Sequence, residues 1–394
     1  MNKITKYSTL LAVAGLAFGL VACGDDSSSS ASAPEEEIPS SSSALEESSS
    51  SAPEKVEVSI TGVVFGSDYQ TGELRWIDKD GEISEKSLSF FQDSKVISHG
   101  ADLYVLERMG SDNITKINPD KLESKGKKAV VWQVSLDDGA NPTDMSFDED
   151  IAWVALQNAD SLVKISTEDG KLVKKSVKIG KFSYEGEASP YVADIELDNG
   201  NLYVLMQRYT KDENYVVTYP KGLLAIYDAS NGSLKDTIQL KTKNPSALAV
   251  VDGQVFVATH GEYNSAYATD ADNKRGIEKV DISKKKSELL ISGEKLGGGI
   301  VSMVVYDDIA YVNINLGMDA NYAAIQELKK VNLSTKKVEN IKDITDPSGS
   351  MAISEGKLYV GDRSASAIQV WNGKKKSTIK QPKGALPPYN IALF

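Results

Sequence analysis

The stretch Leu103-Tyr104-Val105, an aromatic residue between two aliphatic ones, recurs along the chain and decides the fold. Its repeats are Ala152-Trp153-Val154, Leu202-Tyr203-Val204, Val255-Phe256-Val257, Ala310-Tyr311-Val312 and Leu358-Tyr359-Val360. The successive aromatic residues are 49, 50, 53, 55 and 48 residues apart. A period of about 40–50 residues with several strands per unit predicts radially arranged sheets rather than a helical solenoid.

Each repeat contains four short apolar strands joined by tight turns. In one example, Asp198-Asn199-Gly200 precedes the aromatic strand, and residues 224–227 form a third strand. Asn231-Gly232 then turns the chain into a fourth strand, as Asn-Gly and Asp-Gly pairs do in two-residue hairpins. No amphipathic pattern of helical length interrupts this order, so helices are expected to be scarce.

Seven such units predict an all-β fold, a seven-bladed β-propeller of four-stranded antiparallel blades. Six units contain the aromatic strands, and the first is formed by residues 61–65 and 72–77 without an inner strand of its own. The C-terminal residues 387–394 match the inner strands of the other repeats. We expect them to complete blade one, because this pairing removes a seam with exposed strand edges.

Residues 1–22 have the features of a secretory signal, with a positive start and an apolar run from Leu10 to Ala22. The stretch Leu20-Val21-Ala22-Cys23 resembles the lipobox of bacterial lipoproteins. That resemblance implies cleavage before Cys23, a diacylglycerol on its sulfur and an acyl chain on its amine. Several acyl chains anchor a protein where one binds only marginally. The expected location is the cell envelope, with the outer membrane favoured because Gly24, not Asp, follows the cysteine.

Residues 23–54 are expected to be the lipidated cysteine followed by a disordered tether. The stretch 26–54 has 13 serines among 29 residues and no lysine or arginine. Such a composition buries too little apolar surface to offset chain entropy. A flexible chain of this length spans roughly 30 Å. The propeller domain is then residues 55–394.

The charge balance excludes some partners. The chain of 394 residues has a formal charge of -12, of which residues 24–54 contribute about -8. A protein that binds nucleic acid electrostatically would be basic, so that partner is not expected. One cysteine and two histidines exclude a disulfide scaffold and cysteine- or histidine-rich metal sites within one chain. We expect a monomer.

The repeats resemble the YVTN and NHL-type propeller families. In those families a strand like residues 358–362 leads into one like residues 367–371, and the stretch 153–165 is the closest match. The resemblance covers about 340 residues and implies the same architecture. It does not imply one activity, because propellers include binding proteins, lactonases and dehydrogenases alike.

Alignment of the repeats on the aromatic strand places one residue of each inner strand at an equivalent position around the channel mouth. These residues are Lys95, Asp144, Asp194, Ala247, Ser302, Ser350 and Asn390. Asp144, Asp194 and Asn390 supply oxygen atoms that suit a ligand or a hard cation such as calcium, with Asp144 and Asp194 the metal candidates. The alternative is that they form hydrogen bonds between blades and to trapped water.

The longest loops are expected on the same side as this mouth. They contain tyrosines that we consider candidate ligand-binding residues: Tyr209, Tyr215, Tyr263, Tyr267 and Tyr322. Tyrosine combines a stiff apolar surface with a polar tip, which suits recognition of protein or sugar. The alternative is that these rings pack the loops onto the rim of the propeller.

Two lysine runs, Lys284-Lys285-Lys286 and Lys374-Lys375-Lys376, fall at predicted hairpin turns. They suit polyanions, but lysines beside outer strands also block edge-to-edge pairing, and we favour that role. No phosphate-binding glycine loop stands in a strand-to-helix context. No catalytic residue is therefore assigned.

These observations favour a lipid-anchored envelope propeller that is a non-catalytic recognition or assembly module for protein or carbohydrate. Its membrane contact is the diacylglyceryl group on Cys23, and no cofactor is required. The alternative is a metal-assisted hydrolase of the sugar-lactonase kind with a cation at the channel mouth. Those enzymes use a mixed Glu and Asn/Asp ligand set, whereas the predicted ring lacks Glu and contains Lys95 and Ala247.

Overall fold

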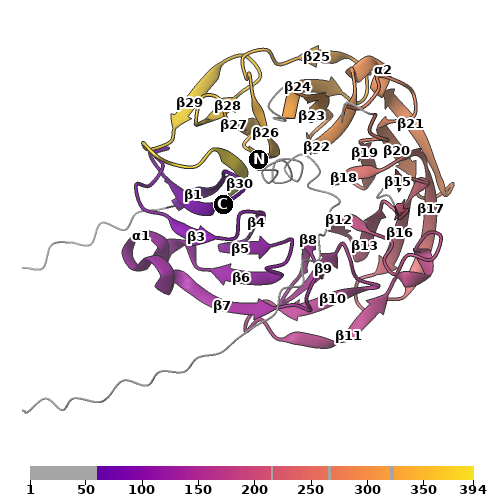
Figure 1. Cartoon of the computed structure of the whole chain (residues 1–394), viewed down its shortest axis with the longest axis horizontal. Helices are drawn as coiled ribbons and strands as arrows, with labels where there is room; N and C mark the ends of the chain where they lie inside the picture. The colour runs from indigo at the N-terminus through magenta and orange to yellow at the C-terminus, as the bar shows by residue number, and fades with distance from the viewer. Residues whose placement is uncertain (1–59, 214–215, 265–267, 320–323) are drawn as a thin grey trace, which may run out of the picture.

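The structure, a computed structural model, describes residues 60–213, 216–264, 268–319 and 324–394. These residues form seven four-stranded antiparallel sheets that are arranged as blades around one axis (Figure 1). The inner strands of neighbouring blades contact one another all the way around the ring. The predicted all-β, seven-bladed propeller is therefore confirmed.

In each blade the strands are ordered from the axis outward. Blade 1 contains β30 (Pro388–Leu393), β1 (Ile60–Ser67), β2 (Gly72–Asp78) and β3 (Leu88–Phe90). Blade 2 contains β4 (Ser94–His99), β5 (Asp102–Glu107), β6 (Asn113–Ile117) and β7 (Val130–Ser135). Blade 3 contains β8 (Pro142–Asp148), β9 (Ile151–Leu156), β10 (Ser161–Ser166) and β11 (Leu172–Lys178). Blade 4 contains β12 (Val192–Asp198), β13 (Asn201–Met206), β16 (Lys221–Asp228) and β17 (Leu234–Lys243).

The remaining three blades follow the same order. Blade 5 contains β18 (Pro245–Val251), β19 (Gln254–Thr259), β20 (Gly276–Asp281) and β21 (Lys286–Ser292). Blade 6 contains β22 (Gly299–Tyr306), β23 (Ile309–Met318), β24 (Ala324–Asn332) and β25 (Val338–Asn340). Blade 7 contains β26 (Pro347–Ser354), β27 (Lys357–Asp362), β28 (Ala367–Trp371) and β29 (Lys376–Lys380).

Helices are short among the described residues, as expected. The α-helices are α1 (Leu122–Lys125) and α2 (Gly293–Leu296), and 3-10 turns cover Pro119–Lys121, Gly126–Ala129 and Gly180–Phe182. None of the helices in the described ranges is long and apolar enough to cross a bilayer. A small hairpin of β14 (Thr210–Lys211) and β15 (Val217–Thr218) lies outside the blades.

The C-terminal strand closes the ring. β30 pairs antiparallel with β1, with Ala392 opposite Val63 and Ile391 opposite Val64. Just before β30, the amide of Leu386 donates a 2.8 Å hydrogen bond to Glu73 Oε1 on β2. The predicted completion of blade one by the chain end is therefore confirmed.

The hydrophobic core lies between blades, in seven clusters that correspond to the seven blade interfaces. Alternate residues of a strand face opposite sides of the sheet, so neighbouring residues of the aromatic motif pack into the two different blade interfaces. Tyr104 packs toward blade 3 and Val105 toward blade 1, and both are fully buried. The recurring motif marks the second strand of each blade because that strand is covered on both sides.

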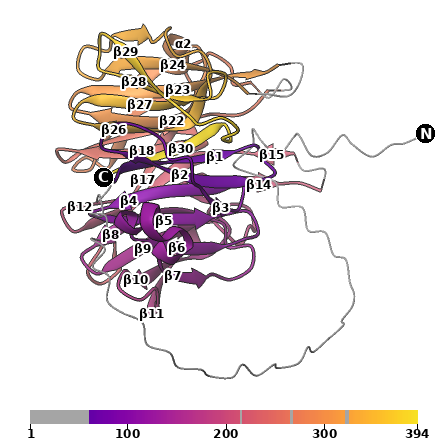
Figure 2. The ribbon, with the colours of Figure 1, turned by 90° about the vertical axis from the view of Figure 1, so that its left-hand side faces the viewer.

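The ring has two distinct ends. We call the end with the hairpin turns, first to second strand and third to fourth, the turn end. The other end, with the connections from second to third strand and from one blade to the next, is the loop end. Figure 2 shows β14 and β15 projecting from the loop end, on the side opposite the C-terminal residue.

Candidate functional site

The predicted ring residues occupy equivalent positions on the inner strands. Asp144 lies opposite Ala155 and Asp194 opposite Leu205, in each case the residue two places after the aromatic of the motif. Lys95, Ala247 and Ser302 follow the same rule in blades 2, 5 and 6. A β-bulge directly precedes Asp144 and Asp194, and a bulge redirects the side chains beside it.

The polar side chains of this ring bind the neighbouring blade. Lys95 Nζ lies 2.7 Å from Asp144 Oδ1. Asp194 Oδ2 accepts a 2.8 Å hydrogen bond from the amide of Leu248 in blade 5. Asn390 Nδ2 donates a 2.9 Å bond to the carbonyl of Ser94 in blade 2. The candidate residues therefore connect inner strands of successive blades.

Asp144, Asp194 and Lys95 form one coupled network. Burial raises the pKa of Asp194 well above its usual range, and the Asp144 carboxylate adds to this. Burial opposes the charged forms of Asp144 and Lys95 too, but their mutual attraction outweighs it, lowering the pKa of Asp144 and raising that of Lys95. The pKa values of the two carboxyls are therefore driven apart: Asp144 is held in its charged form beside Lys95, and Asp194 is shifted toward its protonated form.

This arrangement offers little to a metal ion. Across the described ranges, no three His, Cys, Asp or Glu side chains are grouped so that they could hold one. The Lys95 ammonium lies against Asp144, so a cation there would first have to displace an ion pair. The Asp194 oxygen that faces blade 5 already accepts a backbone amide. What the network does chemically is join blades 2, 3, 4 and 5.

Some of the predicted tyrosines form a cluster at the loop end of blades 4 and 5. Tyr209 stacks on Tyr191 with ring centroids 3.7 Å apart, and Tyr219 meets it edge-on at 5.6 Å. Burial raises the pKa of Tyr219, and the nearby hydroxyl of Tyr263 in blade 5 contributes. We call Tyr191, Tyr209, Tyr219 and Tyr263 the tyrosine cluster.

Burial differs within this cluster. Tyr209 and Tyr219 are 1% and 4% exposed, so their rings support the loops rather than face solvent. Tyr191 and Tyr263 are partly exposed, and the Tyr191 hydroxyl donates a 2.7 Å bond to Glu187. The predicted Tyr215, Tyr267 and Tyr322 lie outside the described residues.

The exposed apolar side chains at the loop end lie on the projecting segments. Val216, beside β15, is 59% exposed, and Leu316 and Ile325 on the β23–β24 hairpin are 40% and 43% exposed. Each of these hairpins extends a second-to-third-strand connection beyond its blade. Blades 4 and 6 therefore present apolar side chains on the same end as the tyrosine cluster.

A second polar layer lies four residues after the aromatic of the motif, and the sequence reasoning missed it. Gln157, Gln207 and His260 occupy this position and are at most 2% exposed. Gln207 Nε2 donates a 2.8 Å bond to Asn244 Oδ1 of the next blade. Burial lowers the pKa of His260 to about 4, so the ring is neutral. The signal was available, since a polar residue recurs at this offset in each of the six aromatic repeats.

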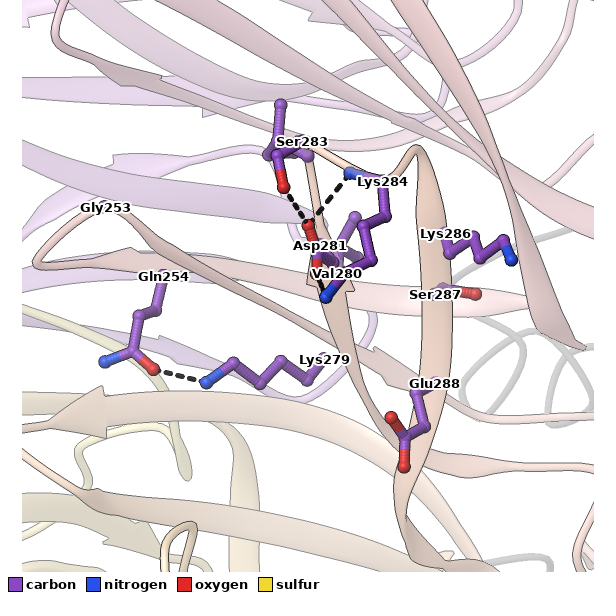
Figure 3. A pocket seen from close by; sticks show the side chains of 11 residues that line it. Gly253, Gln254, Lys279, Val280, Asp281, Ser283, Lys284, Lys286, Ser287 and Glu288 are labelled. Atoms are coloured by element: carbon purple, nitrogen blue, oxygen red, sulfur yellow. Dashed lines mark hydrogen bonds and ion pairs between the residues drawn. The ribbon is translucent and has the colours of Figure 1, made fainter.

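A surface hollow of about 670 Å³ lies at the turn end of blade 5 (Figure 3). Its wall includes part of the lysine run that the sequence singled out. Lys284 Nζ lies 2.8 Å from Asp281, and Lys285, from the same run, lies 2.9 Å from Asp236 of blade 4. Lys279 donates a 2.6 Å bond to Gln254. Most of the cations here are already engaged, so we do not assign a ligand to this hollow.

Comparison with known proteins identifies the architecture only. No protein family and no curated protein sequence matches the chain. A chain in the mitotic checkpoint complex structure superposes with a TM-score of 0.51 at 12% identity, covering 83% of this chain and 96% of that one. AztD of Citrobacter koseri gives 0.49 at 13% identity, with 85% and 98% covered, and the computationally designed Ika8 protein gives 0.47 at 11%, with 81% and 97% covered. At a TM-score of 0.51 and such low identity, the likeness shows a shared fold alone.

Proposed function

We propose that this chain is a lipid-anchored propeller of the bacterial cell envelope that recognises a protein or a glycan without catalysis. The observation that carries the proposal is the tyrosine cluster at the loop end, which segments of two neighbouring blades build together. Buried Tyr209 and Tyr219 hold the loops, and Tyr191 and Tyr263 keep part of their surface accessible. Fixed aromatic side chains bind with little loss of conformational entropy.

The projecting hairpins support the same surface. Val216, Leu316 and Ile325 add apolar area on the loop end, and recognition commonly resides in loops that a rigid scaffold presents. The network of Lys95, Asp144 and Asp194 supplies part of that rigidity, because it connects four consecutive inner strands. The proposed site is therefore a fixed rim with extended loops.

The hydrolase alternative has less support. A catalytic cation at the channel mouth would need free oxygen ligands, and Asp144, Asp194 and Asn390 are engaged with the next blade. Removing these contacts to bind a metal would break connections between blades. A calcium titration that saturates with the wild-type chain, but not after Asp144→Ala and Asp194→Ala, would reverse this preference.

The recognition face can be tested with a charge introduced on the exposed apolar residues. Val216→Asp with Leu316→Asp should reduce recovery of an envelope protein, or binding to a glycan array, by tenfold or more. Val131→Asp with Tyr306→Asp is the matched control, because those side chains are 49% and 43% exposed away from the loop end. Equal recovery with both double variants would show that the loop end is not the recognition face.

The anchor is a separate part of the proposal, and it falls on residues outside the described ranges. Cys23→Ser should release the chain from membranes into the soluble fraction, and intact-mass measurement of the wild type should show the added acyl groups. A wild-type chain with an unmodified cysteine would remove the lipid anchor and leave the recognition face untouched.

A further inference from the structure

Lysines collect at the turn end of the propeller. Each blade has at least one lysine in its third-to-fourth-strand connection or among the first two residues of the fourth strand: Lys79 and Lys86 in blade 1, Lys121, Lys125, Lys127 and Lys128 in blade 2, Lys171 in blade 3, Lys235 in blade 4, Lys284, Lys285 and Lys286 in blade 5, Lys336 and Lys337 in blade 6, Lys374, Lys375 and Lys376 in blade 7. Blade 2 has the most because its connection contains the insertion 119–129 with α1.

The insertion is fixed to blade 1. Leu122 is fully buried in the core between blades 1 and 2, and Trp76 Nε1 donates a 2.9 Å bond to Glu123 Oε2. Lys86 Nζ donates a 3.0 Å bond to the carbonyl of Glu123. The insertion thus presents its lysines from a defined position on the body.

Four lysines of this insertion are available to an external partner. Lys121, Lys125, Lys127 and Lys128 are exposed, and no described residue forms an ion pair with their ammonium groups. They do not lie on an outer strand, so protection of a sheet edge does not account for them. Exposed Val130 and Val131 follow directly on β7, with 37% and 49% of their surface accessible.

The tether would reach the body in the same place. Ile60 begins β1 opposite Asp78, which puts the entry of the chain into blade 1 at the turn end. Figure 1 shows β29, β1 and α1 following one another along one sector, so the entry lies between the lysines of blades 7 and 2. In this sector the connections 78–86, 119–129 and 372–376 contain nine lysines and six carboxylates, and the first-to-second-strand turns 99–102 and 354–357 add one lysine and two carboxylates. The sector thus has a small positive excess, whereas the whole chain has a charge of -12.

We propose that the turn end of blades 7, 1 and 2, which we call the lysine sector, rests against an anionic lipid surface. Three observations lead to it: a local excess of positive charge on an acidic protein, unpaired lysines beside exposed valines, and the start of β1, which the expected tether would join, in the centre of the sector. The proposal rests on the lipid anchor of the proposed function for the nearness of a membrane. Lysines near an anionic bilayer attract its headgroups, and the attraction falls off within about 10 Å.

The test uses the body without its anchor. All seven core interfaces lie within residues 60–394, so a chain of residues 55–394 contains every blade, and circular dichroism checks that it folds. It should co-sediment with vesicles that mix phosphatidylglycerol with phosphatidylcholine, and not with phosphatidylcholine alone. Added salt should release it.

The decisive variant replaces Lys121, Lys125, Lys127 and Lys128 with glutamine. At about fivefold for each lysine near the headgroups, the loss of all four should lower partitioning by roughly several hundredfold. The matched control replaces four lysines located toward the loop end, Lys221, Lys274, Lys380 and Lys383, with glutamine, which changes the net charge equally. The control should partition like the unmodified chain.

Three results would overturn the proposal. They are an absence of binding to the anionic vesicles, equal loss in both quadruple variants, and binding to a soluble polyanion such as polyphosphate without binding to vesicles. The quadruple variant of the insertion should still recover the partner of the loop end. If the chain does not bind anionic vesicles but still recovers its partner, the lipid proposal fails and the recognition function stands. If it binds the vesicles but recovers no partner, the recognition function fails and the lipid proposal stands.

Discussion

Replacing Glu196 with glutamine is expected to make the propeller more stable above neutral pH and to change little in acid. Glu196 lies on inner strand β12, two residues after Asp194 and partly buried. Burial raises the pKa of its carboxyl from 4.5 to about 7, and the negative charge of Asp144 adds to the shift while Lys95 opposes it. The folded protein therefore holds this proton more tightly than the unfolded chain does.

The sign and size follow from that difference. The stabilisation is complete below pH 4.5 and is lost as the pH rises through about 7, because ionisation then costs more in the folded state. A rise from 4.5 to about 7 corresponds to roughly 3 kcal/mol of unfolding free energy. Glutamine has no charge to desolvate, so Glu196→Gln avoids this loss. With partial exposure of the side chain, we expect a gain of about 2 kcal/mol at about pH 8.

Urea unfolding followed by tryptophan fluorescence, over a pH series that spans this range, measures the effect. The control is Glu149→Gln, an exposed carboxyl in the first-to-second-strand turn of blade 3, which should shift the stability curve at no pH. If the wild type and Glu196→Gln lose stability in parallel as the pH rises, Glu196 is not desolvated in the folded ring and the reasoning fails.

Three further predictions concern the ring. Deleting residues 387–394 removes β30 and should abolish cooperative unfolding and expose the body to limited proteolysis. Asp144→Asn leaves the Lys95 ammonium without its partner, so the free energy of unfolding measured in urea should fall by about 3 kcal/mol. Asp194→Asn should lower it by less than about 1 kcal/mol, because the raised pKa of Asp194 shows that this position favours a neutral side chain. Gly276→Ala should lower the melting temperature by several degrees, since its Cβ would lie 2.0 Å from the carbonyl oxygen of Ile291 at a φ of +133°.

The repeat pattern predicted the fold because each blade is covered on both sides by the next. A residue such as Tyr104 faces one neighbouring blade and Val105 the other, so an uninterrupted apolar strand appears in every unit. The same spacing placed Asp144 and Asp194 at equivalent positions, since the ladder pairs each with the residue two places after the aromatic. Residues that recur at the same position of each sequence repeat thus lie at equivalent positions around the propeller axis.

The sequence did not predict which side chains pair with one another across a blade interface. Lys95 and Asp144 are 49 residues apart, and only the angle between two neighbouring sheets brings the ammonium to 2.7 Å from the carboxylate. Without knowledge of that contact, the sequence supports two interpretations of Asp144 and Asp194, as cation ligands or as residues that connect neighbouring blades. The elements added to the blades were also invisible: α1 is four residues long and β14 two, too short for either to produce a periodic signal.

The direction of β1 relates the two surfaces proposed above. The strand begins at Ile60 opposite Asp78, at the turn end, and finishes at Ser67 opposite Gly72, at the loop end. A tether joined to Ile60 therefore attaches at the turn end, which contains the lysine sector and lies opposite the tyrosine cluster. With that sector against lipid, the recognition loops face away from the membrane, so their partner would be a molecule that approaches from the aqueous side. A partner embedded in the same leaflet would require the ring to turn over on its tether, which the lysine contacts would oppose.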